Sequence, residues 1–211
     1  MSSAVIQQQR PSAPVPPAPP GPGLSPGDRG PDVSSYQPNV DWAQVAGAGY
    51  RFAFVKATES TNYTNPYFAQ DWPAITANGL VRGAYHFARP ADSSPLEQAA
   101  YFLAVVAPQA GDLLVLDFEV GDGDLSGWAI GFAQASQLPV MLYSGVPFMR
   151  AHGLDTPEVA SAFGNTLWVA AYQANKPELP HGWPELTFWQ FSDGEAVPGV
   201  QGACDCSIYL P

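Results

Sequence analysis

The sequence predicts an irregular α/β barrel of eight strands with about five helices, in which the last three strands are nearly helix-free. Between Gly30 and about residue 163, five strand-length apolar runs are each followed by a segment with helix-start residues. Beyond Gly164, three more strand-like runs are joined by loop-like segments. Eight strands can close a small, filled barrel, so a TIM-like architecture is expected. A doubly wound open sheet is the alternative, because strand number alone does not prove closure.

The first residues of the chain are expected to lie outside this barrel. Residues 11–31 hold nine of the 23 prolines, and no aromatic residue precedes Tyr36. Such a segment buries too little apolar surface to offset its ordering entropy. The sequence therefore predicts a Pro-rich disordered tail or linker over residues 1–28 and one domain over residues 29–211, with an SH3-type ligand as the alternative use of the tail.

The five strand–helix units follow in order. Their strands are expected at residues 31–36, 51–58, 80–87, 113–119 and 139–145. The pairs Asn65-Pro66, Ser94-Pro95 and Thr156-Pro157 each place a capping side chain before a proline at a helix start.

The three last strands are expected at residues 166–172, 186–192 and 203–210. The final run contains Cys204 and Cys206 on either side of Asp205. Residues i and i+2 of a strand share a face, so the two cysteines are expected as buried thiols that point away from Asp205.

The charge and hydropathy of the chain exclude several classes of partner. Nineteen acidic against eight basic residues give a net charge of -11 and a pI near 4.3, which would repel nucleic acid. No run approaches the roughly 18 apolar residues of a membrane helix, so no membrane insertion is expected. The N-terminal sequence "MSSAVIQQQR" lacks the apolar segment of a signal peptide. The protein is expected to be a monomer.

Four carboxylates are the candidate catalytic residues. Asp117 and Glu119 end the fourth strand in "LLVLDFE" and share one face of it. Asp32 lies in the first strand and Asp205 in the last, and these strands are neighbours if the barrel closes. In such barrels, functional residues gather at the C-terminal ends of the strands. A protonated and an ionised carboxyl group side by side can cleave a glycosidic bond, although an ordinary solvated strand end explains the spacing equally well.

Aromatic residues near the predicted strand ends could bind a sugar. Tyr85, Tyr143, Tyr172 and Trp189 are the candidates, and Tyr36 lies in a similar position. Core packing is at least as good an explanation for each one alone. Lys56, with Glu59 as its partner, is a further candidate ligand contact, with a simple solvated ion pair as the alternative.

No cofactor or metal is expected. His86 lies near a strand end, but a metal site built from His86, Asp117 and Glu119 is not favoured, because the three histidines are scattered. The chain has no phosphate-binding or dinucleotide-binding glycine motif.

Seven segments resemble glycoside hydrolase family 25, the Chalaropsis-type lysozymes, in order and in spacing. They are "DVSSYQ", "DWAQV…GYRFAFVKATES", "GLVRGAYHFARP", "LLVLDFE", "LPVMLYSG", "LWVAAY" and "FWQFSD…PGVQGACDCSIY". The resemblance implies a flattened eight-stranded barrel and an N-acetylmuramidase that hydrolyses the β-1,4 bond between N-acetylmuramic acid and N-acetylglucosamine in peptidoglycan.

The resemblance also implies roles for single residues. Glu119 would be the general acid and Asp117 its neighbour at the reacting centre, with Asp32 and Asp205 completing the acidic cluster. A retaining mechanism is expected, with either a carboxylate nucleophile or the substrate's 2-acetamido oxygen. We favour the acetamido route, with Asp117 positioning that group.

Two other functions stay open at this level. One is a non-catalytic cell-wall carbohydrate-binding or virion structural module, and the other is a hexosaminidase that acts on chitin-like chains. For the muramidase, the chain would act on the bacterial cell wall, as a phage lysin delivered through a holin or in a virion, or exported by another route.

Overall fold

Nine strands and six helices make up the part of the chain that the computed structural model describes, residues 23–211. The strands are β1 (Arg29–Val33), β2 (Phe52–Glu59), β3 (Tyr63–Thr64), β4 (Val81–Phe87), β5 (Leu113–Asp117), β6 (Met141–Gly145), β7 (Leu167–Ala170), β8 (Phe188–Glu195) and β9 (Cys204–Tyr209). The helices are α1 (Trp42–Gly47), α2 (Phe68–Ala77), α3 (Pro95–Val106), α4 (Ser126–Ser136), α5 (Val146–Ala151) and α6 (Pro157–Ala162).

The sheet closes into a barrel of eight strands. The strand order is β1-β9-β8-β7-β6-β5-β4-β2-β3, and β1 also pairs with β2 in parallel, which joins the two ends. Among the described residues, the one strand outside the barrel wall, β3, has two residues and pairs with β2 as a short hairpin at the rim. The predicted barrel is thus confirmed, and the open sheet is wrong.

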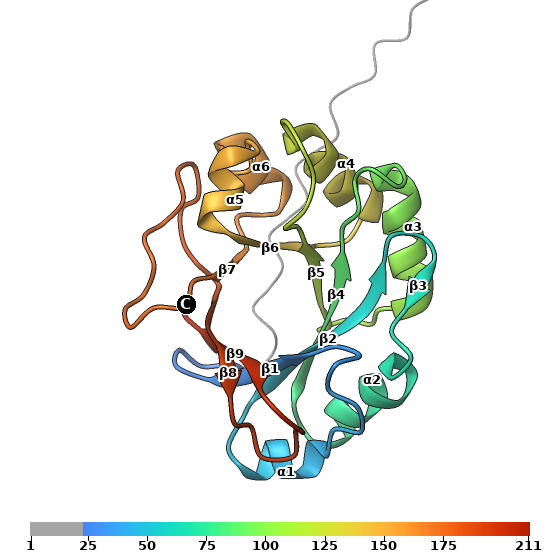
Figure 1. The fold of residues 1–211 in the computed structure, drawn as a ribbon, viewed down its shortest axis with the longest axis vertical. Helices are drawn as coiled ribbons and strands as arrows, with labels where there is room; N and C mark the ends of the chain where they lie inside the picture. Colours follow the sequence, from blue (N-terminus) through green and yellow to red (C-terminus); the bar gives the residue numbers. More distant parts are fainter. Residues whose placement is uncertain (1–22) are drawn as a thin grey trace, which may run out of the picture.

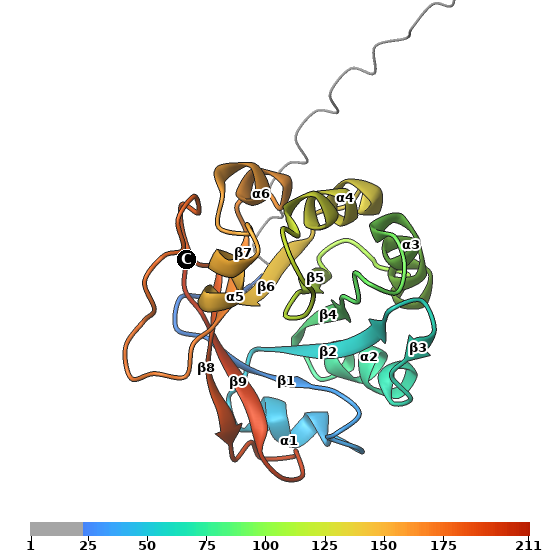
Figure 2. The same cartoon turned by 45° about the horizontal axis from the view of Figure 1, so that its top comes forward.

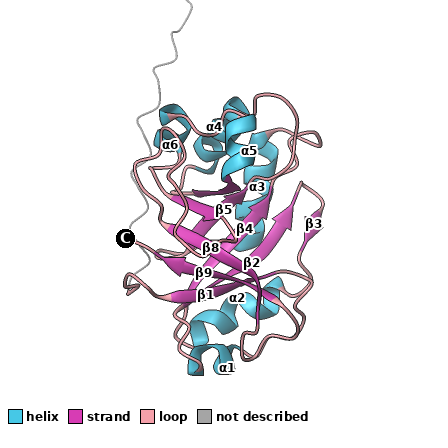
Figure 3. Ribbon diagram, turned by 60° about the vertical axis from the view of Figure 1, so that its left-hand side comes forward, coloured by secondary structure: helices cyan, strands magenta, loops and turns pink. Residues whose placement is uncertain are grey.

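The last three strands of the barrel, β7 to β9, are joined without helices, as expected. Figures 1 and 2 show α2 to α6 around the outside of the wall, whereas the orange and red segments that carry β7, β8 and β9 are joined by loops. In this part of the barrel β9 runs antiparallel to both β8 and β1 (Figure 3). The helix number is six rather than about five, because two short helices, α5 and α6, follow β6.

Helix capping follows the sequence signals at two of the three expected places. Ser94 accepts from the backbone N–H of Glu97, and the Glu97 carboxylate accepts from the N–H of Ser94, which is a complete capping box for α3. Thr156 caps α6 through the N–H of Val159. Asn65 does not cap a helix, because α2 begins only at Phe68 and the Asn65 side chain is used in the loop before it.

The alternation of side chains along β2 shows how the barrel is filled. Phe52 and Phe54 point inward and belong to an aromatic cluster that occupies the barrel interior, whereas Ala53 and Val55 pack outward beneath the helices. The interior cluster consists of Phe52, Phe54, Val115, Met141, Tyr143, Trp168, Phe188 and Tyr209. Gly83 of β4 makes room for it, since a Cβ there would lie 2.1 Å from the Phe54 ring.

Side chains therefore fill the barrel interior below the rim formed by the C-terminal strand ends. Leu24 packs against the same aromatic cluster, and the N–H of Gly27 donates to the carbonyl of Tyr209 at 2.9 Å. The chain therefore contacts the barrel from Leu24 onward, four residues before the expected boundary at residue 28. Most of the predicted tail lies outside the described residues. No helix within residues 23–211 is long and apolar enough to cross a membrane.

Candidate active site

A cleft of about 210 Å³ opens at the C-terminal ends of the barrel strands. The side chains around it come from nearly every strand, so that residues far apart in the sequence meet at one place. They are Asp32, Ser34, Tyr36, Lys56, Tyr85, Phe87, Asp117, Glu119, Tyr143, Trp168, Gln190 and Asp205. All four predicted carboxylates line this cleft, as do Tyr85, Tyr143 and Lys56.

Barrel closure brings Asp32 and Asp205 together. They are direct cross-strand partners in the antiparallel β1–β9 ladder, where opposite residues have their side chains on the same face. Asp32 is buried and Asp205 is partly exposed. On either side of Asp205, Cys204 and Cys206 are buried free thiols, as expected from the alternation.

Asp117 and Glu119 form the second carboxylate pair. Asp117 is the last residue of β5, and Phe118 between the two is fully buried in the outer core, so the acids share the cleft side. Asp117 is only 6% exposed, whereas Glu119 is exposed at the mouth of the cleft. Among the described residues, nothing donates a hydrogen bond to the buried Oδ1 of Asp117. A buried, unpaired acceptor of this kind is available to a donor on a ligand.

The cleft raises the proton affinity of all four acids. Burial raises the pKa of Asp117 well above its usual range, and the charge of Glu119 adds to this. Burial likewise raises the pKa of Asp32 well above its usual range, with the charge of Asp205 as the second cause. The pKa values of Glu119 and Asp205 are also raised, again chiefly by burial. Each pair can therefore retain a proton where an isolated carboxyl group would have lost it.

Gln190 of β8 links Asp32 to two tyrosines. Its side-chain Nε2 donates to both carboxylate oxygens of Asp32 at 3.0 Å, while its Oε1 accepts from the hydroxyls of Tyr143 and Tyr172, each at 2.8 Å. Tyr172 is half-exposed and does not itself line the cleft, but it donates to Gln190, which does. Trp168 forms the floor, where its ring stacks on Phe54 and its Nε1 donates to Ser207.

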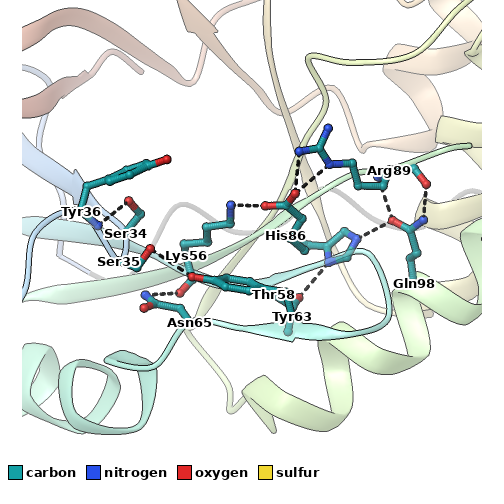
Figure 4. A network of polar contacts seen from close by, with 11 residues as sticks. Ser34, Ser35, Tyr36, Lys56, Thr58, Tyr63, Asn65, His86, Arg89 and Gln98 are labelled. Carbon is teal, nitrogen blue, oxygen red and sulfur yellow. Dashed lines mark hydrogen bonds and ion pairs between the residues drawn. The ribbon is translucent and has the colours of Figure 1, made fainter. Parts of the chain in front are cut away.

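Lys56 is the cationic side chain among the cleft-lining residues of the described chain. Its Nζ lies 2.6 Å from the carboxylate of Glu59, which also pairs with Arg89 at 2.7 Å. The ammonium group lies 5.4 Å from the ring centroid of Tyr63 and 4.8 Å from that of Phe87. The Tyr63 hydroxyl donates to Ser35 in the loop after β1 (Figure 4). The expected Lys56–Glu59 pair is thus present and anchored at the rim.

Tyr36 stands at the opposite edge of this network (Figure 4). Its side chain is 88% exposed although it borders the cleft, and its backbone N–H donates to the Ser34 hydroxyl. An aromatic ring held open to solvent beside a cleft can serve as a stacking platform for a sugar ring.

His86 points to the other side of the wall from Tyr85. It is buried, its Nδ1 lies 2.8 Å from the Thr58 hydroxyl, its Nε2 lies 2.9 Å from Oε1 of Gln98, and its ring stacks on Phe132. Its position is that of a core residue. Within residues 23–211, no group of three or more His, Cys, Asp or Glu side chains is arranged to hold a metal ion.

Two expected sugar-binding residues, Tyr172 and Trp189, are not among the residues that line the cleft. Trp189 is directed away from it and donates from its indole Nε1 to the carbonyl of Ala171, whereas its neighbour Gln190 points inward. Alternation along β8 places Phe188 and Gln190 on the inner face of the barrel and Trp189 on the outer face. The sequence analysis did not name Gln190 or Trp168, which both line the cleft. The two-residue alternation of a strand would have identified them if the inward-facing residues of β7 and β8 had been assigned correctly.

Comparison with known proteins adds an independent line of evidence. The family model described as Glycosyl hydrolases family 25 matches residues 31–200. The N,O-diacetylmuramidase of a Chalaropsis species is 34% identical over 202 residues, covering 84% of this chain and 93% of that protein. Lysozyme M1 of Streptomyces globisporus is 32% identical over 203 residues, 88% of this chain and 68% of that protein. The crystal structure of the bacterial lysozyme from Streptomyces coelicolor matches with a TM-score of 0.81 at 31% identity, over 88% of this chain and 93% of that one.

Proposed function

The chain belongs to family 25 of the glycosyl hydrolases, and we propose that it is a lysozyme that cleaves the β-1,4 bond between N-acetylmuramic acid and N-acetylglucosamine in peptidoglycan. One observation carries the assignment of its chemistry. Two carboxyl groups with raised pKa values, Asp117 and Glu119, stand side by side at the mouth of an open cleft. Glycoside hydrolysis needs one carboxylic acid and one carboxylate at the reacting bond.

Glu119 is the proposed general acid. It is exposed at the open side of the cleft, where a glycosidic oxygen can approach, while Asp117 lies deeper. Burial raises the pKa of both acids, and the charge of Glu119 raises that of Asp117 further. A substrate acetamido N–H that donates to Asp117 favours its ionised form. The proton of the pair then belongs to Glu119, next to the leaving group.

The Oδ1 of Asp117, which has no hydrogen-bond partner within residues 23–211, supports the acetamido route. In this scheme the acetamido oxygen attacks C1 as the glycosidic oxygen leaves with the proton of Glu119, which gives a cyclic oxazolinium ion. Water then attacks C1, the acetamido group is restored, and the Glu119 carboxylate takes the proton of that water. Asp117 would accept the acetamido N–H and stabilise the positive charge that develops on it.

The remaining cleft residues are assigned to binding and charge. Asp32 and Asp205 supply negative charge beside the reacting centre, which favours an oxocarbenium-like transition state. Tyr85, Tyr143 and Tyr172 are proposed to contact the sugar, and Lys56 offers a cationic donor at the rim.

The test is digestion of purified peptidoglycan by the wild type and by Glu119→Gln, with the new reducing ends identified by mass spectrometry. We expect reducing muramic acid from the wild type and a loss of ~10²- to 10⁴-fold in Glu119→Gln, the range for general acid catalysis. Glu158→Gln is the matched control, because Glu158 is exposed in the first turn of α6, outside the cleft.

Three outcomes would contradict parts of this assignment. Reducing glucosamine would identify a glucosaminidase instead of a muramidase. Equal products from the wild type and Glu119→Gln would remove Glu119 as the acid. Binding to peptidoglycan without any new reducing end would leave only a wall-binding module.

A single chain supplies every residue of the cleft, and we propose that the protein acts on the cell wall as a monomer. Size-exclusion chromatography with light scattering tests this: a mass near 22.4 kDa is expected, and a mass of twice that value would contradict it.

A further inference from the structure

Gln190 is the one neutral side chain that bonds directly to a carboxylate of the cleft in the described chain. It is only 1% exposed, it lies on β8, and it bonds to Asp32 of β1, so the contact spans the intervening strand β9 and joins two strands that are not neighbours in the sheet. A buried amide in this position is either a packing element or part of the catalytic apparatus.

The four contacts of the Gln190 amide fix which way it faces. Tyrosine hydroxyls donate to its Oε1 from two separate elements, β6 for Tyr143 and the loop after β7 for Tyr172. Its Nε2 is thereby directed at Asp32, where it lies 3.0 Å from both Oδ1 and Oδ2. If the amide turned over, its oxygen would face the carboxylate, which is tolerable only when Asp32 is protonated.

We propose that Gln190 is a positioning residue that, oriented by Tyr143 and Tyr172, holds Asp32 as an aligned carboxylate at the reacting centre. This inference rests on the proposed hydrolase function. It assigns the four acids unequal parts: Asp32 is held from both oxygens by a donor, whereas Oδ1 of Asp117 has no protein partner among the described residues and is left to the substrate.

The surroundings of Asp32 explain why such a donor is needed. The titratable and charged groups that face it are Asp205 from β9, Asp117 and Glu119 from β5 and its following loop, Lys56 from β2, Tyr85 from β4, Tyr143 from β6 and Tyr172 after β7. Three of these are acids, and burial acts in the same direction, so the surroundings favour protonation of Asp32. The Gln190 contact opposes them, because a hydrogen bond donated to a carboxylate lowers its pKa.

The variant Gln190→Met tests the proposal, because methionine keeps a similar length and offers no donor. The readout is the pKa of Asp32, followed by NMR through the side-chain carboxyl carbon of labelled aspartate. We expect it to rise by about one unit, the size of a tenfold change in proton affinity. The acidic limb of the pH profile of kcat should move up with it, and kcat should fall ~10- to 100-fold, with a smaller change in KM.

Two further variants separate positioning from loss of stability. Gln98→Met removes another buried glutamine, the one that contacts His86, and should lower stability while leaving the Asp32 titration where it was. Tyr172→Phe removes one of the two donors to Gln190 at a half-exposed site, so it can be studied even if Gln190→Met does not fold. It should shift Asp32 in the same direction by less.

An unchanged Asp32 titration in Gln190→Met, or in Tyr172→Phe where Gln190→Met does not fold, would overturn the proposal. The titration needs no substrate, so it judges Gln190 even if the wild type leaves peptidoglycan intact. A wild type that leaves peptidoglycan intact would refute the proposed hydrolase function and would not affect the role of Gln190.

Discussion

Replacement of Asp117 by asparagine should make the protein more stable at neutral pH while it abolishes most of the activity. Asp117 is buried, Oδ1 has no partner among the described residues, and Glu119 is a second acid beside it. Asparagine has nearly the same volume and carries no charge. Its amide N–H can also donate to the Glu119 carboxylate, so the substitution removes a repulsion and adds a donor.

The magnitude follows from what is removed. A buried polar group without a partner costs about 1–3 kcal/mol, and more when it is charged. We therefore expect Asp117→Asn to raise the free energy of unfolding by about 2 kcal/mol at pH 7, which corresponds to a rise of about 4–8 °C in Tm for a domain of this size.

The effect has a defined pH dependence. The pKa of Asp117 is raised in the folded state, so its contribution to stability is complete below its unfolded pKa and is lost as the pH rises through the folded value. The advantage of Asp117→Asn should therefore be present at pH 7 and absent near pH 3, where the aspartate is protonated in both states.

Urea unfolding of the wild type and Asp117→Asn at pH 7 and at pH 3 measures both claims. Asp122→Asn is the control for the charge change, because Asp122 is exposed in the loop after β5 and does not line the cleft. A variant that is less stable than the wild type at pH 7, or equally shifted at both pH values, would refute the reasoning.

Two further predictions concern residues outside the cleft. Ser94→Ala breaks the capping box of α3 and should lower the free energy of unfolding by about 1 kcal/mol in urea; an unchanged midpoint would show that the cap is redundant. Burial lowers the pKa of His86 to about 4, so between its unfolded value near 6.5 and about pH 4 the unfolded chain binds a proton that the folded chain does not. Stability should fall as the pH falls through that window, and the His86 ring protons should show no NMR titration above about pH 5; a midpoint near 6.5 would contradict the buried pairing with Gln98.

Local features of the site could be predicted from local patterns. The position of Asp117 and Glu119 on one face requires only the two-residue repeat of a strand, which also places Phe118 in the core. The meeting of Asp32 with Asp205 follows once eight strands are assumed to close, because the first and last strands must then be neighbours. The family motifs, found in the expected order, then indicated that these acids belong to a glycoside hydrolase.

Other features depend on which alternate residues of each strand face the barrel interior, and the sequence alone does not show this. In "FWQFS" both Trp189 and Gln190 are plausible inward residues, and aromatic character favours Trp189, whereas Gln190 is the one that lines the cleft. The register of β8 against β9 also shifts after Gln190, so the alternation cannot be extended from the strand end. The bonds from Gln190 to Asp32, Tyr143 and Tyr172 connect four separate segments of the chain, and no local signal announces them.

The sequence by itself determined the fold class, the family and the identity of the four acids, because these depend on short-range periodicity and on motifs in fixed order. Only the tertiary structure decided how those acids differ. Asp32 is bonded through both oxygens, Asp117 is buried and its Oδ1 has no partner in the described part of the chain, and Glu119 is open to solvent. Burial and hydrogen bonding set the proton affinity of a carboxyl group, and both arise from contacts between distant segments that form only when the barrel closes.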